Sequence, residues 1–478
     1  MTSPRLNWDV LREIARCADR ATCTSLILTC RFFYHEAAKT ILFEPVLLHN
    51  EDHVSKFLRF VQADDNSRYT YVRDVSFDFY ELPPQLLDSL VRSMAHMTRL
   101  ERMYLGMGER FLNIFPVLAD AIARLTSLRR LAINYAGDLT CAFLNSLQSG
   151  LVSVTLTWIW RFEHEIDPHL LNNQHPAFLL ARCASTLEEL IYKNWLTSSE
   201  VPVFNHSYPK LRTLEMYCDD EFPLVVSYIR AFPNLRRLRV ETLHSESDSE
   251  VVQASVTERL TRHRERNISS QLDPHGPGTW KHLEEFCGFL VDLYVLGLAS
   301  RISSVTFLDD LGGAHHLDFL SAVLSYAQPL HLEIHGRSRL LARPTLNLTT
   351  ILRQSGAARL ESLDIAIRLL EKDGTLDIIS HLHALASSLS QLPSLRRLRL
   401  IVTSAMYPRT LTLPPLAPVE VMLESFDVDA FVRALGEATP SLRDAIVEVV
   451  GPRGKDRRRQ GVIAKTNVEV ARTDVFPG

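Results

Sequence analysis

Short apolar patterns of period two recur along most of the chain. They have the form L-x-x-L-x-L, with other apolar residues in place of some leucines, and their last positions alternate as in a strand with one buried face. Clear copies begin at Val72, Leu100, Leu128, Leu151, Leu187, Leu211, Leu235, Leu283, Ile302, Leu360 and Leu395, and degenerate copies span Leu330–Ile334 and Leu442–Val447. The pattern therefore predicts a series of short strands.

Segments with helical spacing separate the predicted strands. Clear examples are the apolar residues of 86–94, 111–125 and 378–389. Proline at 209, 233, 393 and 440 stands just before a strand pattern, where it ends the preceding helix because it cannot continue one. Helix and strand alternate near the period of roughly 20–29 residues that is typical of leucine-rich repeats. The expected fold is an α/β solenoid with parallel strands on the concave side and helices on the convex side.

A different pattern opens the chain between Leu6 and Phe43. Apolar residues at helical spacing predict one helix from near Asp9 and a second one from near Leu26. A unit of about 40 residues buries too little surface to stand alone without a disulfide, a metal or a partner. These helices therefore need another surface, either in the rest of the chain or on a second protein.

The opening residues resemble an F-box. Its first half usually reads Leu-Pro-x-(Glu/Asp)-(Val/Leu)-Leu-x-x-Ile, and here Leu6-Asn7-Trp8-Asp9-Val10-Leu11-Arg12-Glu13-Ile14 stands. Its second half usually ends in an apolar run, Cys-Arg and aromatic residues, and here Leu26-Ile27-Leu28-Thr29-Cys30-Arg31-Phe32-Phe33 stands. Three positions depart from the usual pattern. Asn7 replaces proline, and Ala18 and Cys23 replace larger residues, so weaker docking than by a consensus F-box is expected.

The resemblance implies a substrate receptor of a Skp–cullin–F-box ubiquitin ligase. The F-box would dock on the Skp-type adaptor, and through it on cullin and a RING protein, while the repeats bind a protein target for ubiquitination and proteasomal degradation. The residues expected at or under the adaptor surface are Leu6, Val10, Leu11, Ile14, Leu26, Leu28, Cys30, Phe32 and Phe33. An alternative is a non-catalytic repeat scaffold whose F-box-like helices only cap the open end of the solenoid.

The later array resembles the leucine-rich repeats that follow an F-box in fungal proteins. The expected domains are the F-box-like helices at 1–46, a connecting segment at 47–68, the solenoid at 69–450 and a basic tail at 451–478. The connecting segment is expected to hold a strand near 46–48 and a helix near 52–62. An irregular insertion at 244–278 is expected to contain a solvated helix or a loop that touches a partner, and a proline-rich surface loop is expected at 404–419.

Charged residues on the predicted strands indicate the kind of target. Pairs of arginines stand at 129–130, 236–237 and 396–397, and alternation along a strand places the second arginine of each pair on the concave side. Carboxylates share that side, and a mixed charge favours a protein partner over nucleic acid. The expected target-binding residues are Arg130, Asn134, Glu215, Tyr217, Arg237, Arg239, Arg397 and Arg399.

Composition adds limits on partners and location. The formal net charge of −4 gives no general attraction to nucleic acid or to anionic membranes. Seven scattered cysteines without a CxxC pair suit a reducing compartment. The start of the chain has no apolar signal core, so a cytoplasmic or nuclear location, or both, is expected. The basic run at 451–460 is either a solvated tail or a nuclear address.

No catalytic or cofactor motif stands out. The chain lacks a GxxxxGK phosphate loop and a GxSxG nucleophile elbow. His164 and His169 are five positions apart with a proline between them, whereas a helical zinc motif places its histidines four apart. The sequence thus predicts no metal, no cofactor and no enzyme, and an enzyme with an unrecognised site is the remaining alternative.

Overall fold

The computed structural model describes residues 7–64, 66–159, 174–195, 204–218, 222–242, 250–311, 316–344, 346–404, 416–450 and 458–464. The chain divides into two compact units. Unit 1 comprises Met1–Glu221 and Arg230–Asn234, and unit 2 comprises Phe222–Ile229 and Leu235–Gly478. Each unit is described by itself.

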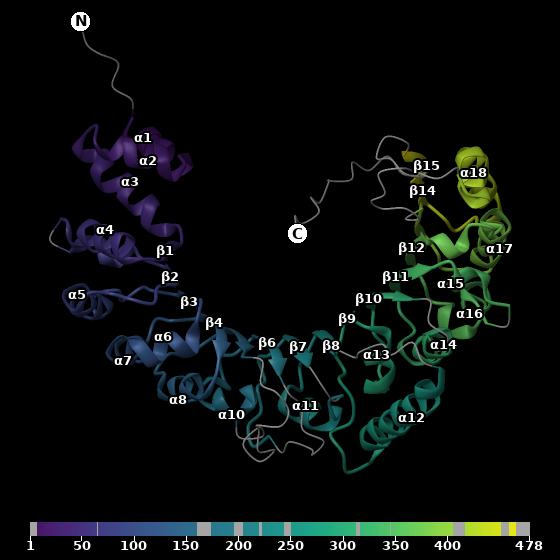
Figure 1. The fold of residues 1–478 in the computed structure, drawn as a ribbon, viewed down its shortest axis with the longest axis horizontal. Coiled ribbons are helices and arrows are strands. Elements are labelled where there is room, and N and C mark those ends of the chain that lie inside the picture. Colours follow the sequence, from purple (N-terminus) through teal and green to yellow (C-terminus); the bar gives the residue numbers. More distant parts are fainter. Residues whose placement is uncertain are drawn as a thin grey trace, which may run out of the picture. The chain divides into compact units, whose positions relative to one another are not determined.

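Unit 1 begins with three helices and continues as a parallel sheet with helices along one side (Figure 1). Its helices are α1 (Trp8–Cys17), α2 (Arg20–Ile27), α3 (Arg31–Phe43), α4 (Glu51–Gln62), η1 (Ser67–Tyr71), α5 (Pro84–Met94), α6 (Gly108–Ile114), α7 (Pro116–Ala123), α8 (Asp138–Ser146), α10 (Pro176–Leu179) and η3 (Ala181–Cys183). Its strands are β1 (Val46–Leu48), β2 (Asp74–Phe77), β3 (Arg102–Leu105), β4 (Arg130–Ala136), β5 (Ser153–Trp158), β6 (Glu189–Trp195) and β7 (Thr213–Cys218).

The strands of unit 1 pair in parallel and in chain order, with the apolar positions of each repeat in register. Val46, Val75, Met103, Leu131, Val154, Leu190 and Leu214 form one buried row across the sheet. The intervening residues point to the opposite side, which we call the open sheet face. Because successive strand residues point to opposite sides, the alternation in the sequence decides which residues are buried.

The helices of unit 1 pack against the buried side of its sheet. Residues 111–125, expected as one helical segment, form two helices, α6 and α7, which meet at Phe115. Pro116 is the first residue of α7. Proline lacks the backbone N–H that a continuous helix would need here, but it fits the first turn of a new helix.

Unit 2 repeats the same arrangement of strands and helices. Its helices are α11 (Val225–Ala231, with its last two residues in unit 1), α12 (Glu250–Leu272), α13 (Leu290–Leu296), α14 (His316–Ala327), α15 (Arg339–Ala342), α16 (Leu348–Leu352), η4 (Ser355–Ala357), η5 (Glu371–Asp373), α17 (Ile378–Leu389), α18 (Pro418–Ser425) and α19 (Val428–Ala438). Its strands are β8 (Arg237–Thr242), β9 (Glu285–Gly288), β10 (Ser304–Leu311), β11 (His331–Arg337), β12 (Ser362–Leu369), β13 (Arg397–Ser404), β14 (Asp444–Val450) and β15 (Arg458–Ala464).

Strands β8 to β14 pair in parallel, and β15 pairs antiparallel with β14. β15 includes the end of the basic run, so part of the segment expected as a tail at 451–478 belongs to the sheet. Residues 451–457 and 465–478 lie outside the described residues. The segment 47–68, expected as a connector, contains a strand and two helices, and β1 pairs with β2. The predicted strand and helix near 46–48 and 52–62 are confirmed as β1 and α4.

Helix α12 occupies the insertion and docks on unit 2 through buried polar side chains. Asn267 accepts a hydrogen bond from the backbone N–H of Val225 (3.0 Å) and donates one to the carbonyl of Val295 (3.0 Å). The Arg264 guanidinium donates to the carbonyl of Tyr294 at 2.6 Å. The helix is therefore an integrated part of the unit rather than a freely solvated one. Residues 244–249 of the expected insertion and 405–415 of the expected proline-rich loop lie outside the described residues.

The observed fold is thus the predicted α/β leucine-rich-repeat solenoid, with helices at its N-terminal end. Each repeat contributes one strand to a parallel sheet and places its helices on the other side. The wide interval between β8 and β9 contains α12, and its described residues form no further strand.

Candidate functional site

Side-chain caps define where α1 and α2 begin. Asn7, at the position usually held by proline, accepts a hydrogen bond from the backbone N–H of Asp9 at 3.1 Å. Asp19 accepts one from the backbone N–H of Thr22 at 2.8 Å. A capping side chain supplies an acceptor for a free N–H group of the first turn, so Asn7 starts the helix by a different route from proline.

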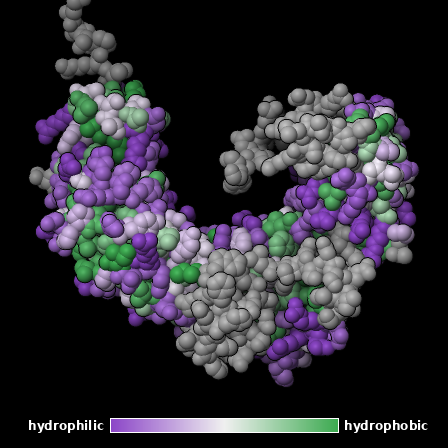
Figure 2. Space-filling model, viewed as in Figure 1, coloured by the Kyte–Doolittle hydropathy of each residue, from purple (hydrophilic) through white to green (hydrophobic). Residues whose placement is uncertain are grey.

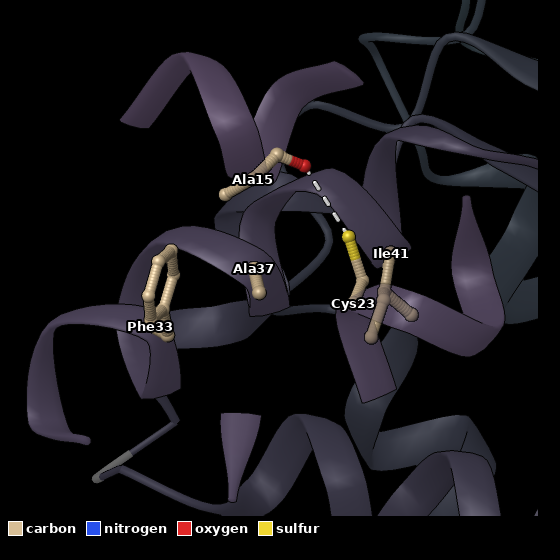
Figure 3. Close-up of a cluster of buried hydrophobic side chains, with 5 residues drawn as sticks. All are labelled: Ala15, Cys23, Phe33, Ala37 and Ile41. Atoms are coloured by element: carbon tan, nitrogen blue, oxygen red, sulfur yellow. Dashed lines mark hydrogen bonds between the residues drawn. The ribbon is translucent and has the colours of Figure 1, made fainter. Parts of the chain in front are cut away.

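The three helices enclose a small core of their own (Figure 3). It consists of Ala15, Cys23, Phe33, Ala37 and Ile41. The Cys23 thiol is fully buried, and it donates to the carbonyl of Ala15 at 3.3 Å. Burial raises the pKa of this thiol. The small size of Cys23 therefore affects the packing of the three helices and not their outer surface.

The predicted adaptor-binding residues separate into a buried, a half-buried and an exposed group. Phe33 belongs to the core, and Leu11, Leu26 and Phe32 are half-buried and pack against it. The exposed group is Val10, Ile14, Leu28 and Cys30. Leu6 lies outside the described residues. The position-by-position match to the F-box pattern therefore selected two kinds of residue. Some pack the three helices against each other, and others are exposed and available to a partner.

Trp8 is an exposed residue that the sequence reasoning missed. Its side chain is 61% exposed, and its ring lies 4.7 Å from the ring of Phe32, centroid to centroid. The match to the F-box pattern gave no signal for it, because the pattern leaves this position open. We call the exposed apolar side chains of α1 and of the end of α2, which are Trp8, Val10, Ile14 and Leu28, the N-terminal apolar surface. Hydrophobic surface is visible over the three helices in Figure 2.

Helix α3 is joined tightly to the repeat that follows it. The Arg68 side chain of η1 is buried, and it donates to the carbonyl of Tyr34 on α3 (3.4 Å) and to that of Phe60 on α4 (3.2 Å). Its guanidinium also lies over the rings of these two residues, at 4.3 and 4.5 Å from their centroids. These contacts fix the three helices to the first repeat, since a buried guanidinium needs its partners in place.

The open sheet face of unit 1 carries four of the predicted target-binding residues. Arg130 is exposed and forms no ion pair with any described residue. Asn134 donates to the hydroxyl of Tyr104 at 2.7 Å. Tyr217 lies with its hydroxyl 3.4 Å from Glu215 and with Lys193 over its ring at 4.7 Å. The structure therefore places these residues on one face, along strands β4 to β7.

The four predicted arginines of unit 2 lie on the open sheet face of that unit, which is the side opposite its buried strand residues, and each pairs with a carboxylate. Arg237 pairs with Glu285, Arg239 with Glu241, Arg397 with Asp444 and Arg399 with Asp364, at 3.2, 2.7, 3.6 and 3.3 Å. The second arginine of each pair begins its strand, and the first arginine is exposed as well. Arg129, Arg236 and Arg396 precede their strands, where alternation does not yet apply.

Further carboxylates complete the ion pairing on the open sheet face of unit 2. Asp310 pairs with Arg337 at 3.0 Å and also with Arg368. The hydrogen bond between Glu333 and His335, at 3.1 Å, lowers the pKa of Glu333 and raises that of His335. This face therefore neutralises most of its charges by itself.

The described residues offer little for cofactor chemistry. No three side chains of His, Cys, Asp or Glu among them lie close enough together to hold a metal ion. The motif with His164 and His169 falls outside them. Asp292 is buried, accepts hydrogen bonds from Thr242 and has Asp309 as a charged neighbour, and its burial raises its pKa to about 8. Among the described helices, none has the length and apolar character needed to cross a membrane.

The fold defines the class of this molecule as a leucine-rich-repeat solenoid preceded by a small helical unit. One similar solved structure is the crystal structure of the leucine-rich repeat-containing protein LegL7 from Legionella pneumophila. It is 10% identical, with a TM-score of 0.33, and the alignment covers 80% of this chain and 98% of that one. No protein-family model matches the chain, and no curated protein does.

Proposed function

We propose that the chain is a substrate receptor of a Skp–cullin–F-box ubiquitin ligase. In this proposal α1 to α3 dock on the Skp-type adaptor, and the repeats hold a protein target close to the ubiquitin-conjugating enzyme. The chain makes no covalent bond itself and acts by raising the local concentration of the target.

The observation that carries the proposal is the N-terminal apolar surface. Trp8, Val10, Ile14 and Leu28 are 61%, 46%, 43% and 86% exposed on a unit of three short helices. Four exposed large apolar side chains are many for so short a helical unit, and interfaces concentrate their energy in a few such anchors. The F-box resemblance assigns the partner to this surface.

The alternative function is a scaffold whose first helices serve only as a cap. The contacts of Arg68 with Tyr34 and Phe60 favour it, because they attach α3 to the first repeat. A cap accounts for the buried side of α3 alone. It gives no reason for apolar side chains on the outer side of α1 and at the end of α2, so capping and adaptor docking are compatible roles of different sides.

The test is binding of the full chain to a purified Skp-type adaptor. Ile14→Asp and Leu28→Asp should each weaken binding by at least about tenfold, because a charge would be buried in an apolar interface. Trp8→Ala should weaken it to a similar extent. Val117→Asp, on α7 of the same unit, is the matched control, since Val117 is 58% exposed and lies away from α1 to α3.

The altered positions are exposed, so the helical content and the thermal unfolding of these variants should stay unchanged. The proposal fails if the wild-type chain does not bind the adaptor. It also fails if Ile14→Asp and Leu28→Asp bind as well as Val117→Asp does.

A further inference from the structure

A polar and aromatic cluster occupies the carboxyl ends of β1 to β4 in unit 1. Leu48, Phe77, Leu105 and Ile133 are in register across these strands. The residues that follow them, His49, Asp78, Gly106 and Asn134, therefore come next to one another. Tyr104, on β3, contacts these residues, because its hydroxyl accepts a hydrogen bond from Asn134 at 2.7 Å. We call His49, Asp78, Tyr104, Asn134 and Tyr135 the Asp78 cluster.

Gly106 makes room for the Asp78 carboxylate. A Cβ atom at position 106 would lie 2.6 Å from Oδ1 of Asp78 and 3.0 Å from its Cγ. The absence of a side chain at position 106, directly after β3, thus leaves space for the carboxylate next to His49 and Gly106. Burial raises the pKa of the Tyr104 phenol, and the nearby Asp78 and Tyr135 raise it further.

Asp78 lacks a permanent counterion among the described residues. Its ion-pair partner there is His49, at 3.4 Å, which carries a charge only when it is protonated. By contrast, Asp74 at the other end of β2 pairs with Arg102 at 2.8 Å. Both members of the His49–Asp78 pair are partly exposed, at 44% and 38%. The carboxylate is therefore accessible and not neutralised by arginine or lysine.

Tyr135, like Asp78, is a neighbour of Tyr104, and it occupies a strained backbone position. Its φ is +54°, in the left-handed region that side chains other than glycine rarely adopt. It lies where the register of β4 and β5 shifts between Asn134 and Ala136, and its side chain is 50% exposed. Such strain is costly and concentrates at functional sites, and the bulge brings a phenol ring to the open sheet face.

We propose that the Asp78 cluster binds an arginine or lysine side chain of the target. The Asp78 carboxylate supplies the opposite charge, and the ring of Tyr135 supplies a face for the cation. The same end of unit 1 already holds a guanidinium in this way, because Arg110 lies 4.5 Å from the ring centroid of Tyr80. An anionic group would meet Asp78 at close range, so the cluster selects cations. This inference rests on the proposed function in one respect: the arginine or lysine is taken to belong to the protein target of the repeats.

The test uses two pools of fluorescein-labelled 12-residue peptides with degenerate sequences. The pools are identical except that two fixed central positions hold arginine in one and citrulline in the other. Citrulline has nearly the same shape as arginine but no charge. Fluorescence anisotropy with the full chain gives the ratio of the two affinities, and the wild-type chain should favour the arginine pool by at least about fivefold.

Three variants probe the cluster in different ways. Asp78→Asn removes the charge. Gly106→Ala keeps the charge but displaces the carboxylate. Tyr135→Gly removes the ring at a backbone position that glycine adopts without strain. Each should bring the ratio close to one. Asp88→Asn is the matched control, because it removes the same charge from an exposed position of α5, and it should retain the wild-type ratio.

The proposal is overturned if the wild-type chain binds both pools equally or binds neither. It is also overturned if Asp88→Asn lowers the ratio as much as Asp78→Asn does, since the preference would then come from net charge. Adaptor binding of the same variants is measured separately and should stay at the wild-type level. Loss of adaptor docking in the earlier test, by contrast, would leave this peptide preference unaffected, so the two failures can be told apart.

Discussion

The open sheet faces of the two units are both built on parallel strands, but their charged side chains pair differently. In unit 2, carboxylates and arginines of neighbouring strands neutralise each other, as Asp364 and Arg399 do at 3.3 Å. Among the described residues of unit 1, Asp78 has His49 as its only ion-pair partner, and Arg130 has none. A partner of unit 1 can supply the missing charges, whereas a partner of unit 2 must compete with pairs that already exist.

The buried ionisable groups of the two units also differ. In unit 1, burial lowers the pKa of His175 to about 3. In unit 2, burial raises the pKa of Asp292 to about 8, although Thr242 donates to its carboxylate through both its backbone N–H and its hydroxyl. Both groups are therefore neutral at neutral pH, but the two units should respond to pH in opposite directions.

The largest expected effect is the loss of stability of unit 2 with rising pH. Between about pH 4 and pH 8, Asp292 keeps a proton when folded that it releases when unfolded. The free energy of unfolding should therefore fall across this window, by roughly 3–5 kcal/mol. Peptide-resolved hydrogen exchange of β8 and α13 across this pH range measures the change in the free energy of unfolding. Asp292→Asn should remove the trend, and a trend that persists in this variant would contradict the assignment.

The second effect is the loss of stability of unit 1 with falling pH. Between its usual pKa of 6.5 and its folded pKa of about 3, His175 is protonated in the unfolded chain but neutral in the folded one. The free energy of unfolding should fall as the pH drops from about 6.5 to 3, by about 2–4 kcal/mol.

The control for the acid response of unit 1 is His175→Asn. In the wild type, His175 Nδ1 accepts a hydrogen bond from the backbone N–H of Ala177 at 3.1 Å, and asparagine keeps an acceptor at this position. Hydrogen exchange of β6 at pH 7 and pH 5 provides the comparison. An equal acid response in this variant would show that other groups cause it.

The smallest effect concerns the ion pairs of the face of unit 2. Arg399→Gln should change the free energy of unfolding by no more than about 1 kcal/mol, because partly exposed pairs contribute little. It should raise the pKa of Asp364 further. Burial already raises that pKa, and Glu333 is its neighbour in register on β11. Carboxyl titration by NMR reports the shift, and an unchanged titration would mean that the pair does not form in solution.

Local patterns determined most of the fold before any contact was known. The alternation in each repeat identified its strand, and residues such as Pro233 and Pro440 correctly marked the end of a helix. These signals suffice because a repeat packs only against its neighbours, so its local sequence decides which side is buried. At Pro116, the helical spacing of apolar residues favours one continuous helix, whereas the proline favours a new helix start. The apolar spacing led to a prediction of one helix, and the structure contains two.

Tertiary structure alone decided which residues of the candidate sites are accessible. The F-box pattern assigned Phe33 and Leu28 the same role, yet the packing of the three helices buries Phe33 and leaves Leu28 86% exposed. The sequence also indicated arginines and carboxylates on the same side of the sheet, but only the pairing of strands joins Arg397 to Asp444, which are distant in the chain. Periodicity specifies the face on which a side chain lies. Its partners depend on which strands become neighbours, and the Asp78 cluster exists only because four strands bring their ends together.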